Sequence, residues 1–268
     1  MRVLVAPGRV GDVAASRVGE VIGMAFHEEG AQVAVVDLTT PLPAPTTLDE
    51  LGRMLDEGLP AVDVAGLTDA LTDVSGLRRV LAGRTFTAIV PDEEVRAPLT
   101  GLSGTAVARA RATSEDLTVG LAADARAREW LRMHDLDDAP GAGACDGLGA
   151  VLLDAGLRLE TALGWAVQRT RLRETAVRAD LVVTACSDLD FQARGGPLVQ
   201  TVVEVAGEAL RPVIVVAGRN FVSRRELRLA GIEDAHAVHA GAVEEPVREP
   251  ELVAVASRVA RTWRFPSR

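Results

Sequence analysis

The chain has 268 residues, of which 48% are hydrophobic, 25% are charged and only 3% are aromatic. This composition excludes a wholly disordered chain and suits one large α/β domain or two smaller ones. The formal net charge of −9 argues against nucleic acid or an anionic membrane as a partner, because both require a basic surface. All 29 basic residues are Arg, so the protein has no mechanism that uses a lysine ammonium group.

No apolar run is long enough to span a bilayer. The first residues, Met1–Pro7, have the pattern of a strand and lack the long apolar stretch of a signal peptide. We therefore expect a cytoplasmic protein. The two cysteines, Cys145 and Cys186, are too few for a disulfide framework and combine with no histidine at a zinc-like spacing, so we expect no metal site.

The first 40 residues predict a β-α-β unit of the kind found in doubly wound parallel sheets. An apolar run at Arg2–Ala6 ends at a Pro-Gly turn and is followed by a helical pattern with Ser16 as its candidate N-cap. Residues 32–38 form the second predicted strand. Three prolines between positions 41 and 45 then mark a crossover into another domain.

The middle of the chain is less clearly patterned. Its predicted elements are a helix at 48–55, a strand at 85–90, and helices at 106–112 and 117–133. On the last helix we expect Leu121, Ala125 and Leu131 to share one apolar face. Its charged residues Asp124, Arg126, Arg128 and Glu129 should form an exposed face of the same helix.

After residue 140, strands and helices alternate, which predicts a parallel sheet with its ligands at the carboxyl ends of the strands. The predicted elements are a glycine-rich loop at 140–149 leading into a helix at 150–155, strands at 179–184, 211–217 and 235–239, and helices at 199–210, 226–229 and 250–263. A polar turn is expected at 185–196. Arg219 and this turn should lie at the carboxyl edge, with Asp188 as a solvated loop charge.

Four motifs follow one another in this part of the chain. They are Pro-Gly-Ala-Gly-Ala with Gly-Leu-Gly at 140–149, Asp-Leu-Val-Val-Thr at 180–184, Asp190 and Gln192 with Gly196, and Pro-Val with Ala-Gly at 212–218. In order and spacing they resemble the C-terminal part of type I glycerate kinases, which transfer the γ-phosphate of ATP to D-glycerate. The resemblance implies a doubly wound domain, residues 1–42 plus 179–268, and an inserted α/β domain, residues 43–178, that bears the glycine-rich loop.

The resemblance also implies a site. Its candidate catalytic residues are Asp190 and Gln192, and its candidate phosphate- or nucleotide-binding residues are Gly141, Gly143, Gly147, Thr184, Ser187 and Gly196. ATP and Mg²⁺ are the implied cofactors of an active enzyme, with a small hydroxy acid and a nucleotide as partners. Read without the resemblance, the glycines fit a tight turn equally well, and Asp190 fits a turn residue after a strand.

The chain departs from the family pattern where the chemistry should take place. The substitutions are Gly8 for Asp, Ala185-Cys186-Ser187 for Gly-Glu-Gly, Ala193 for Thr and Pro197 for Lys. Two further family blocks, rich in Gly and Asp, have no counterpart before residue 140. Phosphoryl transfer depends on cations around the phosphate oxygens and on a carboxylate near the accepting hydroxyl. Arg9, Arg194 or Arg219 would have to replace the missing lysine.

Two hypotheses therefore stay open. The chain is either an ATP-dependent kinase acting on glycerate or a related hydroxy acid, or an inactive family member that binds a metabolite or a partner protein. The fold motifs favour both equally, and the substitutions favour the second. The resemblance also places Cys145 and Cys186 in two segments that border one cleft, where we expect reduced thiols nearer to Asp190 than to His27.

Overall fold

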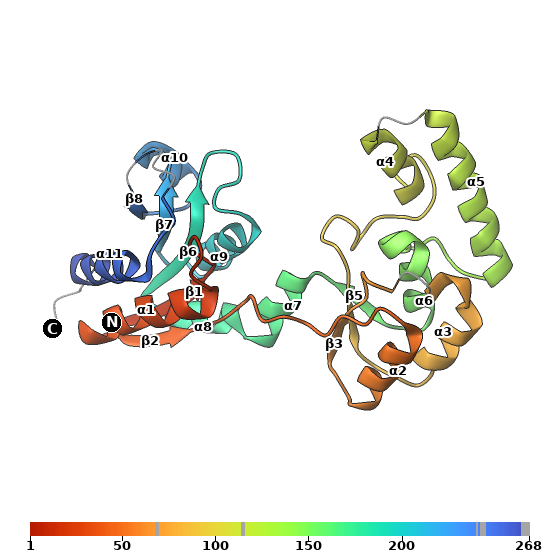
Figure 1. The fold of residues 1–268 in the computed structure, drawn as a ribbon, viewed down its shortest axis with the longest axis horizontal. Coiled ribbons are helices and arrows are strands. Elements are labelled where there is room, and N and C mark those ends of the chain that lie inside the picture. Colours follow the sequence, from red (N-terminus) through yellow and green to blue (C-terminus); the bar gives the residue numbers. More distant parts are fainter. Residues whose placement is uncertain (68–69, 114–115, 240, 242–244, 264–268) are drawn as a thin grey trace. The chain divides into compact units, whose positions relative to one another are not determined.

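The computed structural model describes residues 1–67, 70–113, 116–239, 241 and 245–263. These residues form two compact units, unit 1 (Met1–Thr40 with Ala166–Arg268) and unit 2 (Pro41–Trp165), each built around its own sheet (Figure 1). None of the helices in the described residues is both long and apolar enough to cross a membrane.

The sheet of unit 1 has five parallel strands in the order β2-β1-β6-β7-β8. The strands are β1 (Arg2–Pro7), β2 (Gln32–Val35), β6 (Leu181–Leu189), β7 (Val213–Asn220) and β8 (Asp234–His239). From β1 the chain passes to β2 on one side, whereas β6 pairs with the other side of β1. This arrangement confirms the predicted doubly wound α/β fold, and the strands at Val3 and Val213 belong to one sheet as expected.

Helices cover both faces of this sheet, because its central strands are apolar on both sides. Val183 and Ile214 face a cluster with α1 (Ala15–Glu28) and α11 (Glu249–Thr262). Cys186 and Val215 face a second cluster with α9 (Pro197–Glu208) and α10 (Arg224–Leu229). Apolar clusters therefore cover both faces of the sheet, and the charged side chains of Asp188 and Arg219 lie near the ends of β6 and β7.

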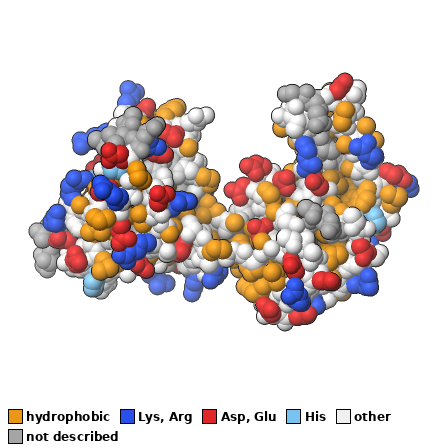
Figure 2. Space-filling model, viewed as in Figure 1, with side chains coloured by type: hydrophobic (Ala, Val, Ile, Leu, Met, Phe, Trp, Pro, Cys, Tyr) orange, Lys and Arg blue, Asp and Glu red, His pale blue; other side chains and the backbone are white. Residues whose placement is uncertain are grey.

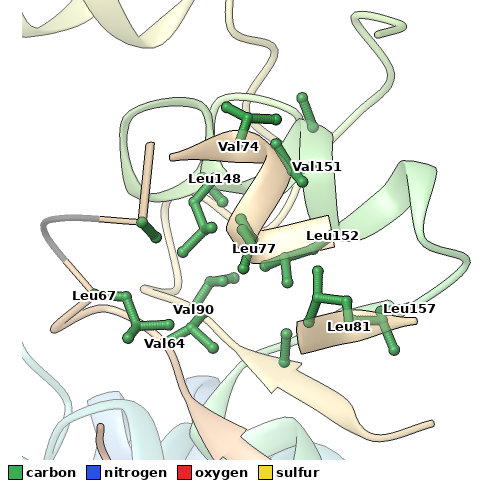
Figure 3. Close-up of a cluster of buried hydrophobic side chains, with 14 of the residues drawn as sticks. Val64, Leu67, Val74, Leu77, Leu81, Val90, Leu148, Val151, Leu152 and Leu157 are labelled. Carbon is green, nitrogen blue, oxygen red and sulfur yellow. The ribbon is translucent and has the colours of Figure 1, made fainter. Parts of the chain in front are cut away.

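Unit 2 has a smaller parallel sheet of β3 (Ala61–Asp63), β4 (Thr87–Ile89) and β5 (Arg158–Glu160). Its helices are α2 (Leu48–Asp56), α3 (Val74–Leu81), α4 (Thr105–Ala112), α5 (Leu117–His134) and α6 (Leu148–Asp154). Leu77 and Leu81 of α3 pack beside Val151 and Leu152 of α6 in a closed apolar core (Figure 3). The sequence did not predict α3, nor β3 and β5, which have only three residues each.

Two further helices connect the units along the chain, α7 (Ala162–Arg169) and α8 (Leu172–Arg178). The sequence assigned all residues up to 178 to the inserted domain, but residues 166–178 group with unit 1. The reason is packing: α8 contacts β1 and α9, and Leu172 is fully buried.

Three local predictions are wrong. The strand expected at 179–184 continues to Leu189, because β6 pairs with β7 as far as Asn220. Ser16 lies inside α1, whose N-cap residue Ala14 makes no side-chain cap bond. On α5, Leu121 is 46% exposed and Ala125 is exposed as well.

The charged face predicted for α5 is also wrong at one position. Asp124 is buried, and its carboxylate accepts hydrogen bonds from the Gly101 N–H at 2.6 Å and from Arg128. It shares the buried side of α5 with Gly120 and Leu131 at helical spacing, so this side of the helix includes a polar contact to the preceding loop.

Candidate functional site

The carboxyl edge of the unit 1 sheet is where a doubly wound fold binds its ligands, at the point where the strand order reverses. That point lies between β1 and β6. Gly8 follows β1 directly, and its N–H donates to the Ala185 carbonyl at 2.9 Å. A Cβ on Gly8 would lie 2.6 Å from that oxygen, so the backbone approach leaves no room for the aspartate of the family pattern.

Ser187 lies beside this loop, near the end of β6. Its hydroxyl accepts from the Gly11 N–H at 3.0 Å and donates to the Arg9 carbonyl at 3.3 Å. The loop after β1 is thus fastened to β6 by one hydroxyl. The Ser187 hydroxyl proton is engaged by the Arg9 carbonyl, and the role of Ser187 in phosphate binding stays a prediction.

Thr184 is fully buried within the sheet, one position further from the edge than Ala185. Its hydroxyl donates to the Ala6 carbonyl of β1 at 2.8 Å. In this structure Thr184 therefore joins the two central strands, and its role in phosphate binding stays a prediction.

Asp190 follows β6 directly. One carboxylate oxygen, Oδ1, accepts from the Ala193 N–H at 2.6 Å, and its main-chain carbonyl accepts from the Arg194 N–H at 3.0 Å. Both bonds shape the turn, as expected for an aspartate after a strand. The second oxygen, Oδ2, takes part in neither bond, so Asp190 keeps an acceptor at the carboxyl edge.

The rest of this turn is tightly wound, since Arg194, Gly195 and Gly196 all have positive φ, at 49°, 79° and 88°. Gly196 is the N-cap of α9, and its N–H donates to the Ala193 carbonyl at 2.8 Å. Pro197 then occupies the first helical position, which suits proline because no N–H is needed there. Gln192 is exposed on the same turn.

Asp188 and Arg219 form an ion pair between neighbouring strands, where the sequence predicted a solvated Asp188. The Arg219 Nε lies 2.6 Å from Oδ1 and its Nη2 lies 3.0 Å from Oδ2. The guanidinium also lies 5.6 Å from the centroid of the Phe221 ring. The pair lines an open pocket of about 360 Å³ together with Gly11 and Ser187. The positive charge of Arg219 is therefore balanced by the Asp188 carboxylate.

The glycine-rich segment belongs to unit 2, and the backbone N–H groups of its first half, residues 141–145, are engaged. The Gly141 and Gly143 N–H groups both donate to the Ala97 carbonyl, at 3.2 and 2.9 Å, and the Cys145 N–H donates to a Glu94 oxygen at 2.8 Å. A Cβ on Gly143 would lie 2.4 Å from the Pro98 carbonyl. In this conformation Gly141 and Gly143 serve close packing, and their role in phosphate binding stays a prediction.

Gly147 closes the same segment as the N-cap of α6, with a φ of 112° that favours glycine. Cys145 and Asp146 beside it also have positive φ, at 48° and 62°. Asp146 forms an ion pair with Arg109 of α4. Because Asp146 balances the charge of Arg109, this pair leaves no net positive charge for an anion here.

The two cysteines are free and form no disulfide. Cys186 is buried between β6 and α9, and Cys145 is half-buried against the core of unit 2. Burial raises the pKa of each thiol to about 12, and nearby carboxylates add to the effect. The expected exposure of Cys186 to a cleft is therefore wrong. Across the described ranges, no three His, Cys, Asp or Glu side chains come together as a metal site.

A second pocket, which the sequence did not predict, opens directly beside Asp190. It has a volume of about 220 Å³ and a mainly apolar lining, with Asp190, Arg194 and Glu226 as its charged residues. Its apolar residues are Leu189, Phe191, Val222, Leu227, Leu229, Ala230 and Ile232. The one signal in the sequence was the aromatic Phe191 within a polar turn.

Charged side chains of both signs are interspersed over the face of the molecule seen in Figure 2. Many are paired, as Arg2 is with Asp180 and Arg17 with Glu249. Arg194 is exposed and, like several other arginines such as Arg126 and Arg225, forms no ion pair with any residue that the structure describes. Of the three arginines considered as replacements for the missing lysine, Arg219 is neutralised, and Arg9 donates through Nε to the Gly11 carbonyl.

Comparison with known proteins gives one family. The sequence profile of the glycerate kinase family matches residues 47–264. Two uncharacterized proteins, from Mycobacterium bovis and Mycobacterium tuberculosis, are each 30% identical over 207 residues, which is 73% of this chain and 53% of the relative. The chain thus spans about half the length of the curated relatives it matches.

A crystal structure described as "putative glycerate kinase 2", from Salmonella typhimurium LT2, has a similar fold. It superposes with a TM-score of 0.67 at 17% identity, over 98% of each chain. At this identity the similarity concerns the fold alone.

Proposed function

The chain belongs to the glycerate kinase family, and we propose that it binds a small hydroxy acid of the glycerate class and transfers phosphate to it from ATP only slowly. The observation that carries this proposal is the position of Asp190. Its carboxylate stands at the carboxyl edge of a doubly wound sheet, beside a pocket and with one oxygen outside the hydrogen bonds of its own turn. An acceptor there suits the proton of a substrate hydroxyl.

We expect a slow rate because this chain lacks groups that surround the phosphate in other phosphotransferases. Such enzymes place cations and backbone N–H groups around the transferred group. Here the lysine is replaced by Pro197, Arg219 is balanced by Asp188, and the glycine-rich segment has engaged its donors. Arg194 is the cation that this turn still offers.

ATP and Mg²⁺ belong to this proposal as substrate and metal. Mg²⁺ in phosphotransferases is held by one or two carboxylates together with phosphate oxygens. Asp188 is paired with Arg219, and the second oxygen of Asp190 is assigned to the substrate hydroxyl, so Mg²⁺ would be held mainly by the phosphate oxygens. The glycine-rich segment, as folded, does not fit a phosphate cradle. A cytoplasmic location stays a prediction from the sequence.

The test is a turnover assay with Mg-ATP and D-glycerate, followed by phosphorus NMR. We expect fewer than about one turnover per second, the lower end of the usual enzymatic range. Asp190→Asn should lower this residual rate by about 10²–10⁴-fold, as for the loss of a general base. Glu233→Gln, an exposed acid elsewhere in unit 1, is the matched control. Turnover of hundreds per second would contradict the proposal.

Binding without catalysis is the second candidate, and the engaged N–H groups of the glycine-rich segment favour it. A thermal-shift series with ATP, ADP and D-glycerate, each with Mg²⁺, separates the two. A ligand at a hundred times its dissociation constant stabilises a protein by about 2.7 kcal/mol. Stabilisation by the hydroxy acid alone, without turnover, would support the binding function.

A further inference from the structure

The pocket beside Asp190 has a construction that the proposed function does not explain. Its floor is formed by Leu189, Leu227 and Ile232, which belong to the buried cluster between the sheet and α9 and α10. Its walls are Phe191, 67% exposed, and Leu229, 81% exposed. An apolar hollow that reaches the core and is framed by exposed apolar side chains is typical of a small-molecule site.

The rim of this pocket has three charged side chains, two of which accept hydrogen bonds from backbone N–H groups of their own turn or helix cap. Asp190 Oδ1 accepts from the Ala193 N–H, and Glu226 Oε2 accepts from the Ser223 N–H in the capping box of α10. The third charge, Arg194, has no ion pair within the described part of the chain. The rim therefore offers a free cation for an anionic group and, at Asp190, a free oxygen for a hydroxyl donor.

We infer that the ligand of this pocket is a 2-hydroxy carboxylate with an apolar side group. Its carboxylate pairs with Arg194, its hydroxyl donates to Asp190, and its side group occupies the hollow between Phe191 and Leu229. The inference rests on the proposed function for the hydroxy acid class and goes beyond it in the side group. Glycerate carries only a hydroxymethyl group there and would leave the apolar lining uncovered.

Charge complementarity and size favour this ligand over a protein partner. A volume of about 220 Å³ holds one branched or aromatic side group. A carboxylate and a hydroxyl on adjacent carbons satisfy both free rim groups at once. A second protein chain would cover Phe191 and Leu229 without needing either group.

The experiment is titration calorimetry of the full chain, without nucleotide, with D-glycerate, lactate and 3-phenyllactate. We expect 3-phenyllactate to bind at least about tenfold more tightly than lactate, since one methylene in an apolar pocket is worth about tenfold or more. Equal affinities for these two acids would overturn the inference.

Two variants test the two halves of the recognition. Ala230→Leu fills the pocket and should weaken 3-phenyllactate about tenfold or more while leaving lactate unchanged. Phe191→Ser, at an exposed position, tests the same wall if Ala230→Leu fails to fold. Arg194→Gln should weaken both acids, whereas Arg228→Gln, an exposed arginine of α10 outside the pocket, should weaken neither. Unchanged 3-phenyllactate affinity in Phe191→Ser and Arg194→Gln would refute the assignment.

Sedimentation of Leu229→Asp and of the control Leu210→Asp, whose side chain is 88% exposed elsewhere, tests the alternative. An oligomer that only Leu229→Asp dissociates, with acid binding unaffected, would make this face an interface and the inference wrong. Because calorimetry needs no turnover, its result is independent of the kinase assay. Tight binding without phosphorylation would overturn the proposed reaction alone.

Discussion

Close backbone contacts account for several glycines of the family motifs in this chain. Gly143 packs against the Pro98 carbonyl, and Gly149 allows α6 to approach the Gly141 carbonyl, which a Cβ on Gly149 would meet at 2.0 Å. At such positions glycine is required because a side chain would overlap the neighbouring backbone, whether or not a ligand binds. At the scale of single residues, glycines of one type can therefore serve packing in one protein and phosphate binding in another.

Gly143→Ala should lower the free energy of unfolding by about 1–3 kcal/mol, because the added methyl group overlaps the Pro98 carbonyl. Gly207→Ala is the matched control: it lies in α9, and its Cβ would meet nothing within 4 Å. That change should raise stability by about 0.5–1 kcal/mol through helix propensity. Urea unfolding measures both, and two effects of the same sign would contradict the packing role.

The two thiols should react slowly in the folded protein. Burial raises the pKa of Cys145 and Cys186 to about 12, so at pH 8 nearly all of both groups are neutral thiols. Labelling with iodoacetamide should rise about tenfold per pH unit and become fast on unfolding in urea, which is the control. Rapid labelling of the folded chain at pH 8 would show that a thiol is exposed.

The same pKa values predict a pH dependence of stability. The folded state holds these protons to higher pH than the unfolded chain, whose thiols titrate near pH 9. The folded state therefore binds more protons between about pH 9 and pH 12, and the free energy of unfolding should fall across that window. Replacing both cysteines by alanine should flatten this fall.

At the scale of elements, the ends of β6 and β7 depend on a charged pair. Asp188 and Arg219 are register partners, and their two hydrogen bonds continue the contact between the strands beyond the apolar part of the sheet. This pairing lengthens β6 past the predicted turn and brings Asp190 to the edge at the pocket. The side chains of the pair thus position the site without belonging to the apolar core.

A double-mutant cycle of Asp188→Asn and Arg219→Gln should give a coupling of about 1 kcal/mol in unfolding free energy, modest because both side chains are partly exposed. The exposed pair Glu129–Arg132 on α5 is the control, and its coupling should be smaller because solvent screens both charges. Equal couplings for the two pairs would mean that the bond between the strands adds nothing to the fold.

At the scale of the whole molecule, each unit has its own sheet and its own closed core. Residues 41–165 expressed alone should therefore fold, and far-UV circular dichroism with a cooperative thermal transition would show it. The matched comparison is the same fragment with Leu77→Ala, which removes a fully buried side chain and should cost about 2–5 kcal/mol. A fragment without a transition would show that unit 2 needs the rest of the chain.

The sequence by itself determined the fold class, most of the strands and helices of unit 1 and the family. Apolar runs such as Val213–Ala217 and helical spacing are local patterns, and the spaced motifs of residues 140–238 lie in one order along the chain. Short elements such as β3 and β5, with three residues each, carry too little pattern to be found this way. Their strand pairing, which is not local, forms them.

Only the tertiary structure decided which contacts the candidate site residues make. Thr184 bonds to Ala6 across 178 positions, and Ser187 bonds to Gly11 across 176. The donors of Gly141 and Gly143 are taken by a carbonyl more than forty positions earlier in the chain. A hydroxyl or an N–H group has the same identity whether it meets a ligand or its own chain, so its role is settled by which partner folding brings within hydrogen-bond distance.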